Sequence, residues 1–155
     1  INKSGKAKTA YGCDISYYMV ERAMKQYKEE NTFFFRADAQ RLPLASESFD
    51  TVMMLNALDR IPNTVQALSE AYRVLNNRGT LILANCMPLQ NEKDVAGGYK
   101  IVYVPEKCRI ESMEEAIEKS GCIMKKKIEK LPWNIKTIED GNELLYVDIA
   151  IGVKE

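Results

Sequence analysis

The sequence contains no histidine, and none of its four cysteines belongs to a C-x-x-C pair. Because structural zinc sites are built from such cysteine pairs and histidines, we expect no metal site. Most of the cysteines have apolar neighbours, where a reduced thiol packs as a small apolar side chain. We therefore expect a reducing, cytoplasmic compartment. The cysteines are Cys13, Cys86, Cys108 and Cys122.

Long apolar runs and an excess of one charge are also missing. No stretch approaches the roughly 20 apolar residues that span a bilayer, and the opening INKSGKAKT lacks the apolar centre of a signal peptide. Lysine plus arginine and aspartate plus glutamate both number 22, so we expect neither nucleic acid nor a membrane as partner. A local run of lysines predicts a solvated edge strand rather than a nucleic-acid site. These lysines are Lys125, Lys126, Lys127 and Lys130.

What is present is the composition of an ordinary globular protein. Of the 155 residues, 46% are hydrophobic and 28% are charged, which is sufficient for a single domain with a core. Strand-like and helix-like segments alternate, which predicts a doubly wound, mostly parallel α/β sheet. The predicted strands are 9–13, 32–35, 51–55 and 80–84, followed by an antiparallel pair at the sheet edge, 122–131 and 144–153, joined by a turn at Asp140 and Gly141. The predicted helices begin after Ser16, after Asn63 or Thr64, and at Ser112, and the last ends at Gly121.

Polar side chains follow three of these strands at the point where each strand ends. They are Asp14, Asp38 and Asn56. In open parallel sheets, ligands bind beyond the carboxyl ends of the strands. These residues therefore predict the rim of a ligand pocket. A carboxylate such as that of Asp14 can accept hydrogen bonds from two ribose hydroxyls, although dinucleotide-binding domains place an acid at the same point.

The segment from Arg36 to Asp50, RADAQRLPLASESFD, is more specific. It resembles the class I S-adenosylmethionine (SAM)-dependent methyltransferases of the small-molecule type, whose sequences read D-A-x-x-L-P-F-x-x-x-S-F-D. The resemblance implies a Rossmann-like methyltransferase fold, SAM as cofactor and a small-molecule substrate. The Arg73-Val74-Leu75 triplet and Gly79 are similar to the family's R-V-L-K-P-G-G turn, in which Asn76 and Asn77 would tolerate a positive φ.

The resemblance also implies roles for individual residues. Asp14 would hold the ribose of SAM, and Ile15 would pack against the adenine. Asp38 would accept from the exocyclic amine of the adenine, and the N–H of Ala39 would face a ring nitrogen. Asn56 completes the cofactor-binding set.

In the family, the turn that follows the position of Asn56 faces the substrate. It often reads L-H-H there, whereas this chain has Leu58, Asp59 and Arg60. Asp59 is the candidate general base, and a surface acid is the alternative. Residues 86–109 occupy the place of variable substrate-covering elements, and we expect Trp133 and the methionines to fill the core.

The glycine-rich G-x-G-x-G loop of the family does not occur in these residues, and neither does the strand before it. The sequence also opens with Ile1 rather than methionine, so we expect an N-terminally incomplete domain over residues 1–155. In the family, that strand lies centrally, next to the strand that ends at Asp14. Without it, backbone groups would be left unpaired at a cost of roughly 1 to 3 kcal/mol each.

Three functional classes follow from these observations. The first is a SAM-dependent methyltransferase acting on a small molecule. The second is a non-catalytic, methyltransferase-like subunit that binds a partner chain, or a second copy as a homodimer, through an exposed sheet edge. The third, an NAD-dependent oxidoreductase, is disfavoured by Ser48-Phe49-Asp50 and by the segment from Arg73 to Gly79.

Overall fold

The computed structural model describes residues 8–86, 110–137 and 141–155. Contacts within the chain divide it into two compact units, Ile1–Pro43 (unit 1) and Leu44–Glu155 (unit 2). The expected turn at Asp140 and most of the expected substrate-covering segment lie outside the described residues.

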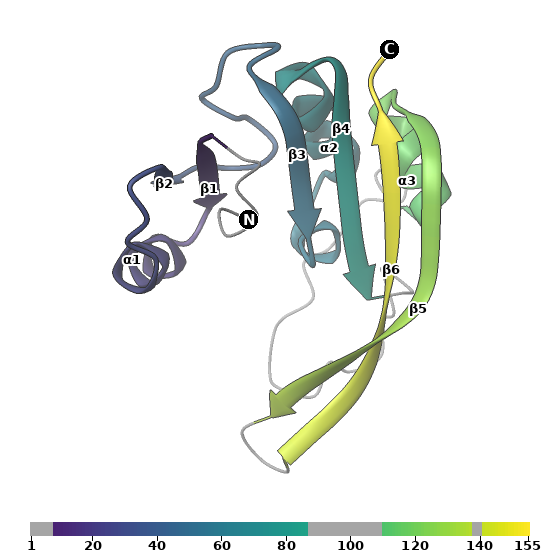
Figure 1. Cartoon of the computed structure of the whole chain (residues 1–155). Helices are drawn as coiled ribbons and strands as arrows, with labels where there is room; N and C mark the ends of the chain where they lie inside the picture. Colours follow the sequence, from purple (N-terminus) through teal and green to yellow (C-terminus); the bar gives the residue numbers. More distant parts are fainter. Residues whose placement is uncertain (1–7, 87–109, 138–140) are drawn as a thin grey trace. The chain divides into compact units, whose positions relative to one another are not determined.

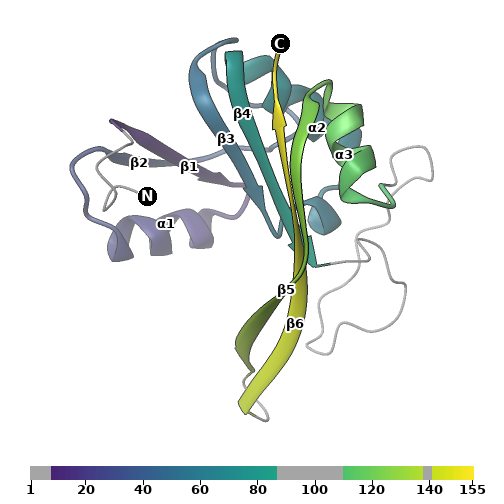
Figure 2. The ribbon, with the colours of Figure 1, turned by 45° about the vertical axis from the view of Figure 1, so that its right-hand side comes forward.

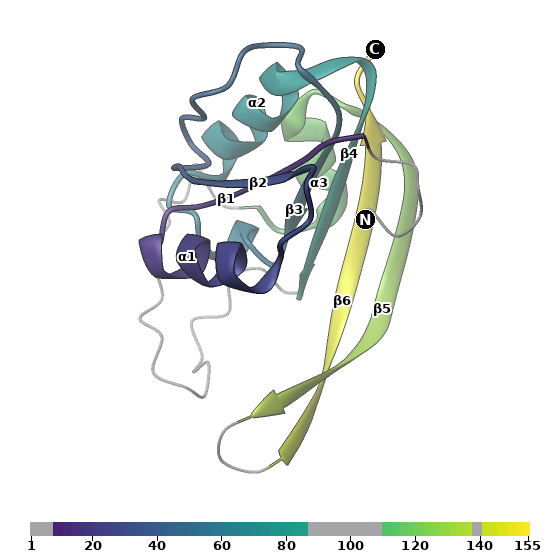
Figure 3. The same ribbon diagram turned by 60° about the vertical axis from the view of Figure 1, so that its left-hand side comes forward.

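Unit 1 is a strand, a helix and a second strand. Strand β1 spans Ala10–Asp14, helix α1 spans Tyr17–Gln26, and strand β2 spans Thr32–Arg36. The strands are parallel, with Asp14 opposite Arg36, and α1 contacts both of them (Figure 3). The Oγ of Ser16 accepts a hydrogen bond from the N–H of Met19 at 3.4 Å, which caps α1 as predicted.

Close packing within unit 1 depends on a glycine in β1. A Cβ added to Gly12 would lie 2.8 Å from the ring of Phe34 in β2. The ring of Tyr27, at the end of α1, lies 6.2 Å from the same Phe34 ring. Larger side chains at position 12 would therefore displace the ring that joins the strands to the helix.

Unit 2 contains a four-stranded sheet in the order β3-β4-β6-β5 (Figure 1). Strands β3 and β4 are parallel, and β6 is antiparallel to both β4 and β5. This mixed sheet confirms the predicted α/β fold with a C-terminal antiparallel pair. The elements of unit 2 are β3 (Phe49–Leu55), the 3-10 helix η2 (Leu58–Arg60), α2 (Thr64–Val74), β4 (Leu75–Cys86), α3 (Met113–Ser120), β5 (Ile123–Thr137) and β6 (Gly141–Val153).

The core of unit 2 lies between the sheet and the helices α2 and α3, which cover the same face (Figure 2). Leu83 of β4 is paired with Met54 of β3 and with Ala150 of β6. Paired residues share a face, and all three side chains are buried. Leu68 and Ala71 of α2 are also buried. The helical spacing of these two residues places an apolar side of α2 toward the sheet.

Three expectations from the sequence are wrong in detail. Strand β4 begins at Leu75 rather than at residue 80. The positive φ in the turn after α2 belongs to Arg78, at 65°, and not to either asparagine. Trp133 is 41% exposed and does not fill the core. Among the methionines that the structure describes, Met54 and Met113 are buried, whereas Met19, Met24 and Met53 are exposed.

The antiparallel pair is also longer than predicted. Strand β5 continues past Leu131 to Thr137, and β6 starts at Gly141 rather than at Leu144. The last residue of β4, Cys86, pairs with Val147. The β5 residues 132–137 and the β6 residues 141–146 therefore extend beyond β4, and we call this two-stranded extension the arm (Figure 1).

The predicted edge strand of lysines is confirmed. Among the described strands, β5 pairs only with β6, and Lys125 and Lys126 are exposed on it. Lys127 forms ion pairs with Glu129 of the same strand, at 2.6 Å, and with Glu114 of α3. The pKa of Glu114 is lowered, first by its hydrogen bond with Lys127. Charged side chains on an outer strand oppose pairing with further strands.

Candidate functional site

The carboxyl ends of β1 and β2 form one edge of unit 1, and two of the predicted acids lie there. The N–H of Ala37 donates to the carbonyl oxygen of Asp14 at 3.1 Å, which continues the strand pairing past the end of β2. Asp38 follows directly. Because the strands are parallel and adjacent, both acids lie at the ligand edge that the sequence predicts.

Asp14 presents a carboxylate with one oxygen engaged locally. Its Oδ1 accepts a hydrogen bond from the N–H of Ser16 at 2.7 Å, which fixes the turn between β1 and α1. Within the described part of the chain, its Oδ2 has no hydrogen bond or ion pair, and the residue is exposed. This free oxygen can accept from a ligand hydroxyl.

Ile15 is 61% exposed next to this carboxylate. The Nε of Arg36 donates to the carbonyl oxygen of Ile15 at 2.9 Å and so holds the Ile15 backbone against the end of β2. An exposed apolar side chain at a ligand edge can cover a flat apolar ring. No spacing or motif predicts this contact of Arg36, although the residue opens the RADAQ segment.

The Asp38 carboxylate is engaged within its own loop. Its Oδ1 accepts from the N–H of Gln40 at 2.9 Å and from the Nε2 of Gln40 at 3.1 Å, and Oδ2 lies 3.1 Å from the same Nε2. To accept from a ligand amine, Asp38 would have to share or lose the Gln40 side-chain contact. The intervening Ala39 is half-buried, and within the described residues its N–H has no acceptor.

The thiol that precedes Asp14 is not a candidate nucleophile. Burial, and then the negative charge of Asp14, raise the pKa of the Cys13 thiol above its usual value of 9.0. A thiol in this state is protonated at neutral pH, and the protonated form is a poor nucleophile. Cys13 is exposed on β1, and no chemical role is assigned to it.

In unit 2, Asn56 follows the carboxyl end of β3. Its φ is 50°, in the left-handed region that asparagine tolerates better than most residues. Its N–H donates to the carbonyl oxygen of Ala84 in β4 at 2.6 Å. The side-chain Oδ1 is buried and has no hydrogen-bond partner among the described residues. A strained backbone that presents a buried acceptor is a feature of ligand sites.

Asp59 lies on η2, which follows Asn56 along the chain. Its Oδ2 is 3.9 Å from the Nε of Arg60, the outer limit of an ion pair. Its Oδ1 is buried without a hydrogen-bond partner in the described part of the chain. A carboxylate oxygen that is shielded from water and uncommitted can accept a proton from a bound molecule.

The loop from Leu44 to Ser48 is fixed by Arg73 of α2. The Nη1 of Arg73 donates to the carbonyl oxygen of Leu44 at 2.8 Å and to the Oγ of Ser46 at 3.3 Å. The Nε of Arg73 forms an ion pair with Glu70 at 2.7 Å, and this hydrogen bond raises the pKa of Arg73. The loop that leads into the S-F-D letters at the start of β3 is thus anchored to α2.

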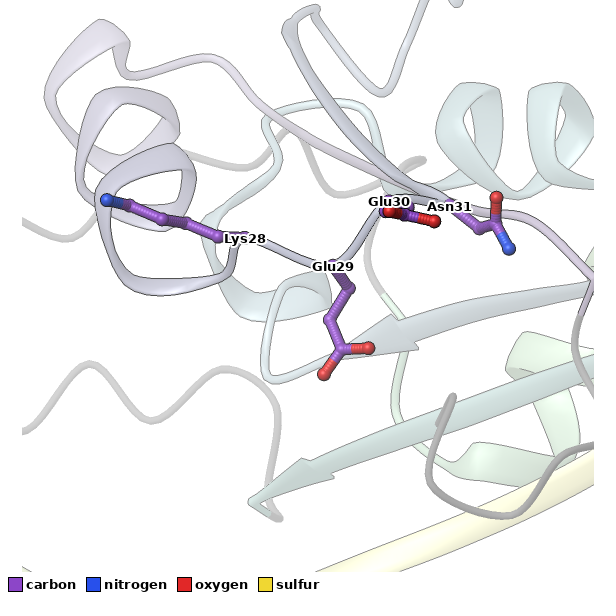
Figure 4. A pocket seen from close by; sticks show the side chains of 4 residues that line it. All are labelled: Lys28, Glu29, Glu30 and Asn31. Atoms are coloured by element: carbon purple, nitrogen blue, oxygen red, sulfur yellow. The ribbon is translucent and has the colours of Figure 1, made fainter.

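A hollow on unit 1 is a poor candidate for the site. It is lined by Lys28, Glu29, Glu30 and Asn31 (Figure 4), which form the turn from α1 into β2. This turn lies at the amino end of β2, whereas ligands bind at the carboxyl ends of parallel strands. Its walls are mostly charged, unlike those of a small-molecule site.

Residues 8–86, 110–137 and 141–155 lack two kinds of feature. Within these ranges, no helix is long and apolar enough to cross a membrane. Among the same residues, no group of three or more histidine, cysteine, aspartate or glutamate side chains could hold a metal ion.

Comparison with protein families decides the classification. The family described as a methyltransferase domain matches residues 2–83. The chain belongs to this methyltransferase family. The matched region includes all six predicted site residues, from Asp14 to Asp59, and the family depends on SAM. The resemblance found in the Arg36 to Asp50 segment is therefore confirmed.

Named relatives are similar to about half of this methyltransferase chain. The ubiquinone/menaquinone biosynthesis C-methyltransferase UbiE of a Bradyrhizobium species is 36% identical over 84 residues, or 52% of this chain. The same protein of Rhizobium meliloti is 37% identical over 87 residues. The matches cover 33% and 34% of these relatives, about a third of their length.

Solved structures agree on the fold. A chain in the complex between the Haloferax volcanii Trm112 methyltransferase activator and a methyltransferase matches 98% of this chain and 74% of its own length, with a TM-score of 0.72 and 17% identity. At such identity the match supports the fold alone, and it confirms a Rossmann-like methyltransferase architecture with C-terminal antiparallel strands.

Proposed function

We propose that the protein transfers a methyl group from SAM to a small-molecule acceptor. The observation that carries the proposal is the uncommitted Oδ2 of Asp14 at the carboxyl end of β1, inside the segment that matches the methyltransferase family. Asp14 would hold the ribose hydroxyls, and the exposed Ile15 would cover the adenine. Asp38 would accept from the adenine amine, and the N–H of Ala39 would donate to a ring nitrogen.

A carbon atom is the proposed position of methylation, because the relatives compared above are named as C-methyltransferases. SAM supplies a methyl group on a sulfonium, whose sulfur leaves as a neutral thioether. The acceptor carbon gives the electron pair of the new bond and must then lose its proton. The uncommitted Oδ1 of Asp59 is the proposed acceptor of that proton, and the buried Oδ1 of Asn56 would accept from a hydroxyl or amine of the bound molecules.

The cofactor part of the proposal is tested by isothermal titration with SAM. We expect Asp14→Asn and Asp38→Asn to weaken binding about tenfold to a hundredfold, because each removes a charged hydrogen-bond acceptor. Glu30→Gln is the matched control, since Glu30 is an exposed acid of the same unit at the other end of β2. Unchanged affinity in both aspartate variants would refute the assignment.

The chemical step is tested with naphthoquinol, a simple ring acceptor, and mass spectrometric detection of the added methyl group. We expect Asp59→Asn to lower kcat by roughly a factor of 100 or more with little change in KM for SAM, as for loss of a general base. An undiminished kcat would make Asp59 a surface acid.

A second candidate function is a methyltransferase-like subunit that binds a partner chain. The structural neighbour from Haloferax volcanii comes from a complex with an activator protein, and β3 is a terminal strand of the described four-stranded sheet. Strand edges can pair with another chain. A molar mass above that of one chain, measured by light scattering, together with no SAM binding, would favour this function.

Under either proposed function, we place the protein in the cytoplasm. The free thiols of Cys13 and Cys122 fit that reducing compartment.

A further inference from the structure

The loop that follows β2 is closed by hydrogen bonds from its own backbone. The N–H of Arg41 donates to the carbonyl oxygen of Asp38 at 3.0 Å, and the two residues pair as a short antiparallel bridge. The N–H of Gln40 donates to the Oδ1 of Asp38 at 2.9 Å. Because both donors are backbone groups, the Asp38 carboxylate keeps two supports that do not depend on the side chain of Gln40.

The side-chain amide of Gln40 lies across the Asp38 carboxylate. Its Nε2 is 3.1 Å from Oδ1 and 3.1 Å from Oδ2, so this nitrogen sits between the two oxygens. An amide nitrogen carries two hydrogens and can donate to both oxygens from this position. The place from which one nitrogen reaches the whole carboxylate is therefore filled by the protein itself.

Little acceptor capacity remains on Asp38 for a ligand. An ionised carboxylate offers about four lone-pair sites. Oδ1 accepts from the backbone N–H and from the side-chain amide of Gln40, and Oδ2 accepts from the same amide. A ligand amine could reach Oδ2 alone while the amide stays. To contact both oxygens, it must replace the amide of Gln40.

The exocyclic amine of adenine is the same kind of donor as the glutamine amide. Each is an N–H2 group on an unsaturated carbon. In adenine, this donor lies next to a ring nitrogen that accepts a hydrogen bond. The N–H of Ala39, between Asp38 and Gln40 in the chain, has no acceptor within the described residues. Adenine can therefore take the place of the amide and also satisfy this N–H.

This replacement has a cost that only some ligands meet. The hydrogen bonds between the Gln40 amide and Asp38 are lost when a ligand amine takes their place. The net contribution of one such bond corresponds to roughly a threefold to tenfold change in an equilibrium constant. A purine without the amine does not displace the amide, so its affinity does not include this cost.

We propose that Gln40 is a specificity-determining residue of the cofactor site, an assignment that rests on the function proposed above. In the free protein, its side-chain amide holds the place of the adenine amine on Asp38, and it leaves when the cofactor binds. Gln40 thereby sets how strongly the site prefers a purine with the amine to one without it. The exchange is non-covalent, and Gln40 acts through Asp38.

The test compares two ligands that differ by one amine. The first is S-adenosylhomocysteine, the thioether that remains when SAM has lost its methyl group. The second is its analogue with hydrogen in place of the exocyclic amine. In isothermal titration, we expect Gln40→Leu to bind S-adenosylhomocysteine roughly threefold to tenfold more tightly and to change the affinity for the analogue by less than about twofold.

A matched control uses the same substitution elsewhere in unit 1. Gln26 is an exposed glutamine at the end of α1. We expect Gln26→Leu to bind both ligands as the unsubstituted protein does.

A spectroscopic measurement follows the exchange in the unsubstituted protein. The side-chain amide signals of Gln40 in a heteronuclear NMR spectrum are those that disappear in Gln40→Met. We expect S-adenosylhomocysteine to move these signals toward those of the exposed Gln26 amide, because the hydrogen bonds to a carboxylate are lost. The analogue without the amine should leave them in place. A merely structural role of Gln40 predicts no difference between the two ligands.

Several results would overturn the assignment. Unchanged or weaker binding of S-adenosylhomocysteine in Gln40→Leu would show that the amide supports Asp38 and does not compete with the ligand. Equal tightening for both ligands, an equal effect in Gln26→Leu, or equal movement of the NMR signals would also refute it. Each of these results leaves the proposed function standing. An absence of S-adenosylhomocysteine binding in both the unsubstituted protein and Gln40→Leu would instead refute the cofactor site, and this assignment with it.

Discussion

Among single residues, Lys154 has the largest predicted effect on stability. It is only 6% exposed. Its Nζ donates to the carbonyl oxygens of Leu75 at 2.8 Å and Tyr72 at 3.2 Å, and lies 4.5 Å from the centre of the Tyr72 ring. A cation at the C-terminal end of α2 satisfies carbonyls that the helix itself leaves free.

We expect Lys154→Met to lower the free energy of unfolding by about 2 kcal/mol. The methionine side chain has a similar length, but the carbonyl oxygens of Tyr72 and Leu75 lose their hydrogen-bond donor. Urea denaturation at neutral pH measures this difference. Lys125→Met, at an exposed position on β5, is the control and should change stability by less than about 0.5 kcal/mol. Equal stability of the two variants would show that water replaces the ammonium group.

At the scale of elements, α3 illustrates how short helices are held at their ends. The Oγ of Ser112 accepts from the N–H of Glu115 at 3.1 Å, and the Glu115 carboxylate accepts from the N–H of Glu111 at 2.7 Å. The helix ends at Gly121, whose φ of 88° suits glycine. The bond from the Glu111 N–H, and then Lys119, lower the pKa of Glu115 from 4.5.

This lowered pKa predicts a dependence of stability on pH. The Glu115 carboxylate stabilises the folded state above the ordinary pKa of a glutamate, and this contribution is lost as the pH falls through its lowered folded pKa. We expect Glu115→Gln to cost roughly 0.5 kcal/mol at pH 6 and to cost less at pH 3. Urea midpoints at both pH values measure this, with the exposed Glu118→Gln as control. A cost that does not change with pH would contradict the linkage.

Helix ends were predictable from the sequence because single residues determine them. Ser16, Ser112 and Gly121 each act at the predicted position, through a side-chain oxygen or a positive φ. Strand lengths were less predictable, because long-range pairing determines them. Pro132 and Asn134 are typical of loops, yet both pair across β6 in the arm.

The positions of the candidate site residues in the fold were predictable to a similar degree. The strand-end positions of Asp14 and Asn56 follow from the alternation of elements, and the methyltransferase letters identified the family. The hydrogen bonds from Gln40 to Asp38 and from Arg36 to Ile15 depend on side-chain directions that no spacing encodes. Lys154 was missed for a related reason, since a charged residue at a strand end is normally solvated.

For the whole molecule, the absence of histidine has a consequence for solution behaviour. The formal net charge is zero and the sequence pI is about 6.6. With no group of pKa near 6.5, the charge stays close to zero from roughly pH 5.5 to 7.5. Weak repulsion and exposed apolar side chains both favour self-association. Examples are Tyr11, Phe33, Met53 and Leu55.

We therefore expect light scattering at fixed concentration to be high and nearly flat over this range, and to fall below about pH 4 and above about pH 9 as charge develops. Replacing Lys125 and Lys126 by glutamate changes the formal net charge from zero to −4, since each substitution replaces +1 by −1. This variant should scatter less at neutral pH. A sharp maximum near pH 6.6 in the unsubstituted protein would indicate that specific ion pairs, rather than net charge, control association.

The contacts of Lys154 also constrain the order in which unit 2 folds. Its N–H donates to Gly79, its carbonyl oxygen accepts from Arg78, and its side chain closes α2 across 79 residues of sequence. Strand β4 pairs with β6, which lies far from it in the sequence, whereas β5 and β6 are consecutive in the sequence. During synthesis, α2 and β4 therefore leave the ribosome without a helix cap and with an open strand edge. Contacts so distant in sequence form late and slowly, so we expect unit 2 to complete its fold only after β6 has been synthesised.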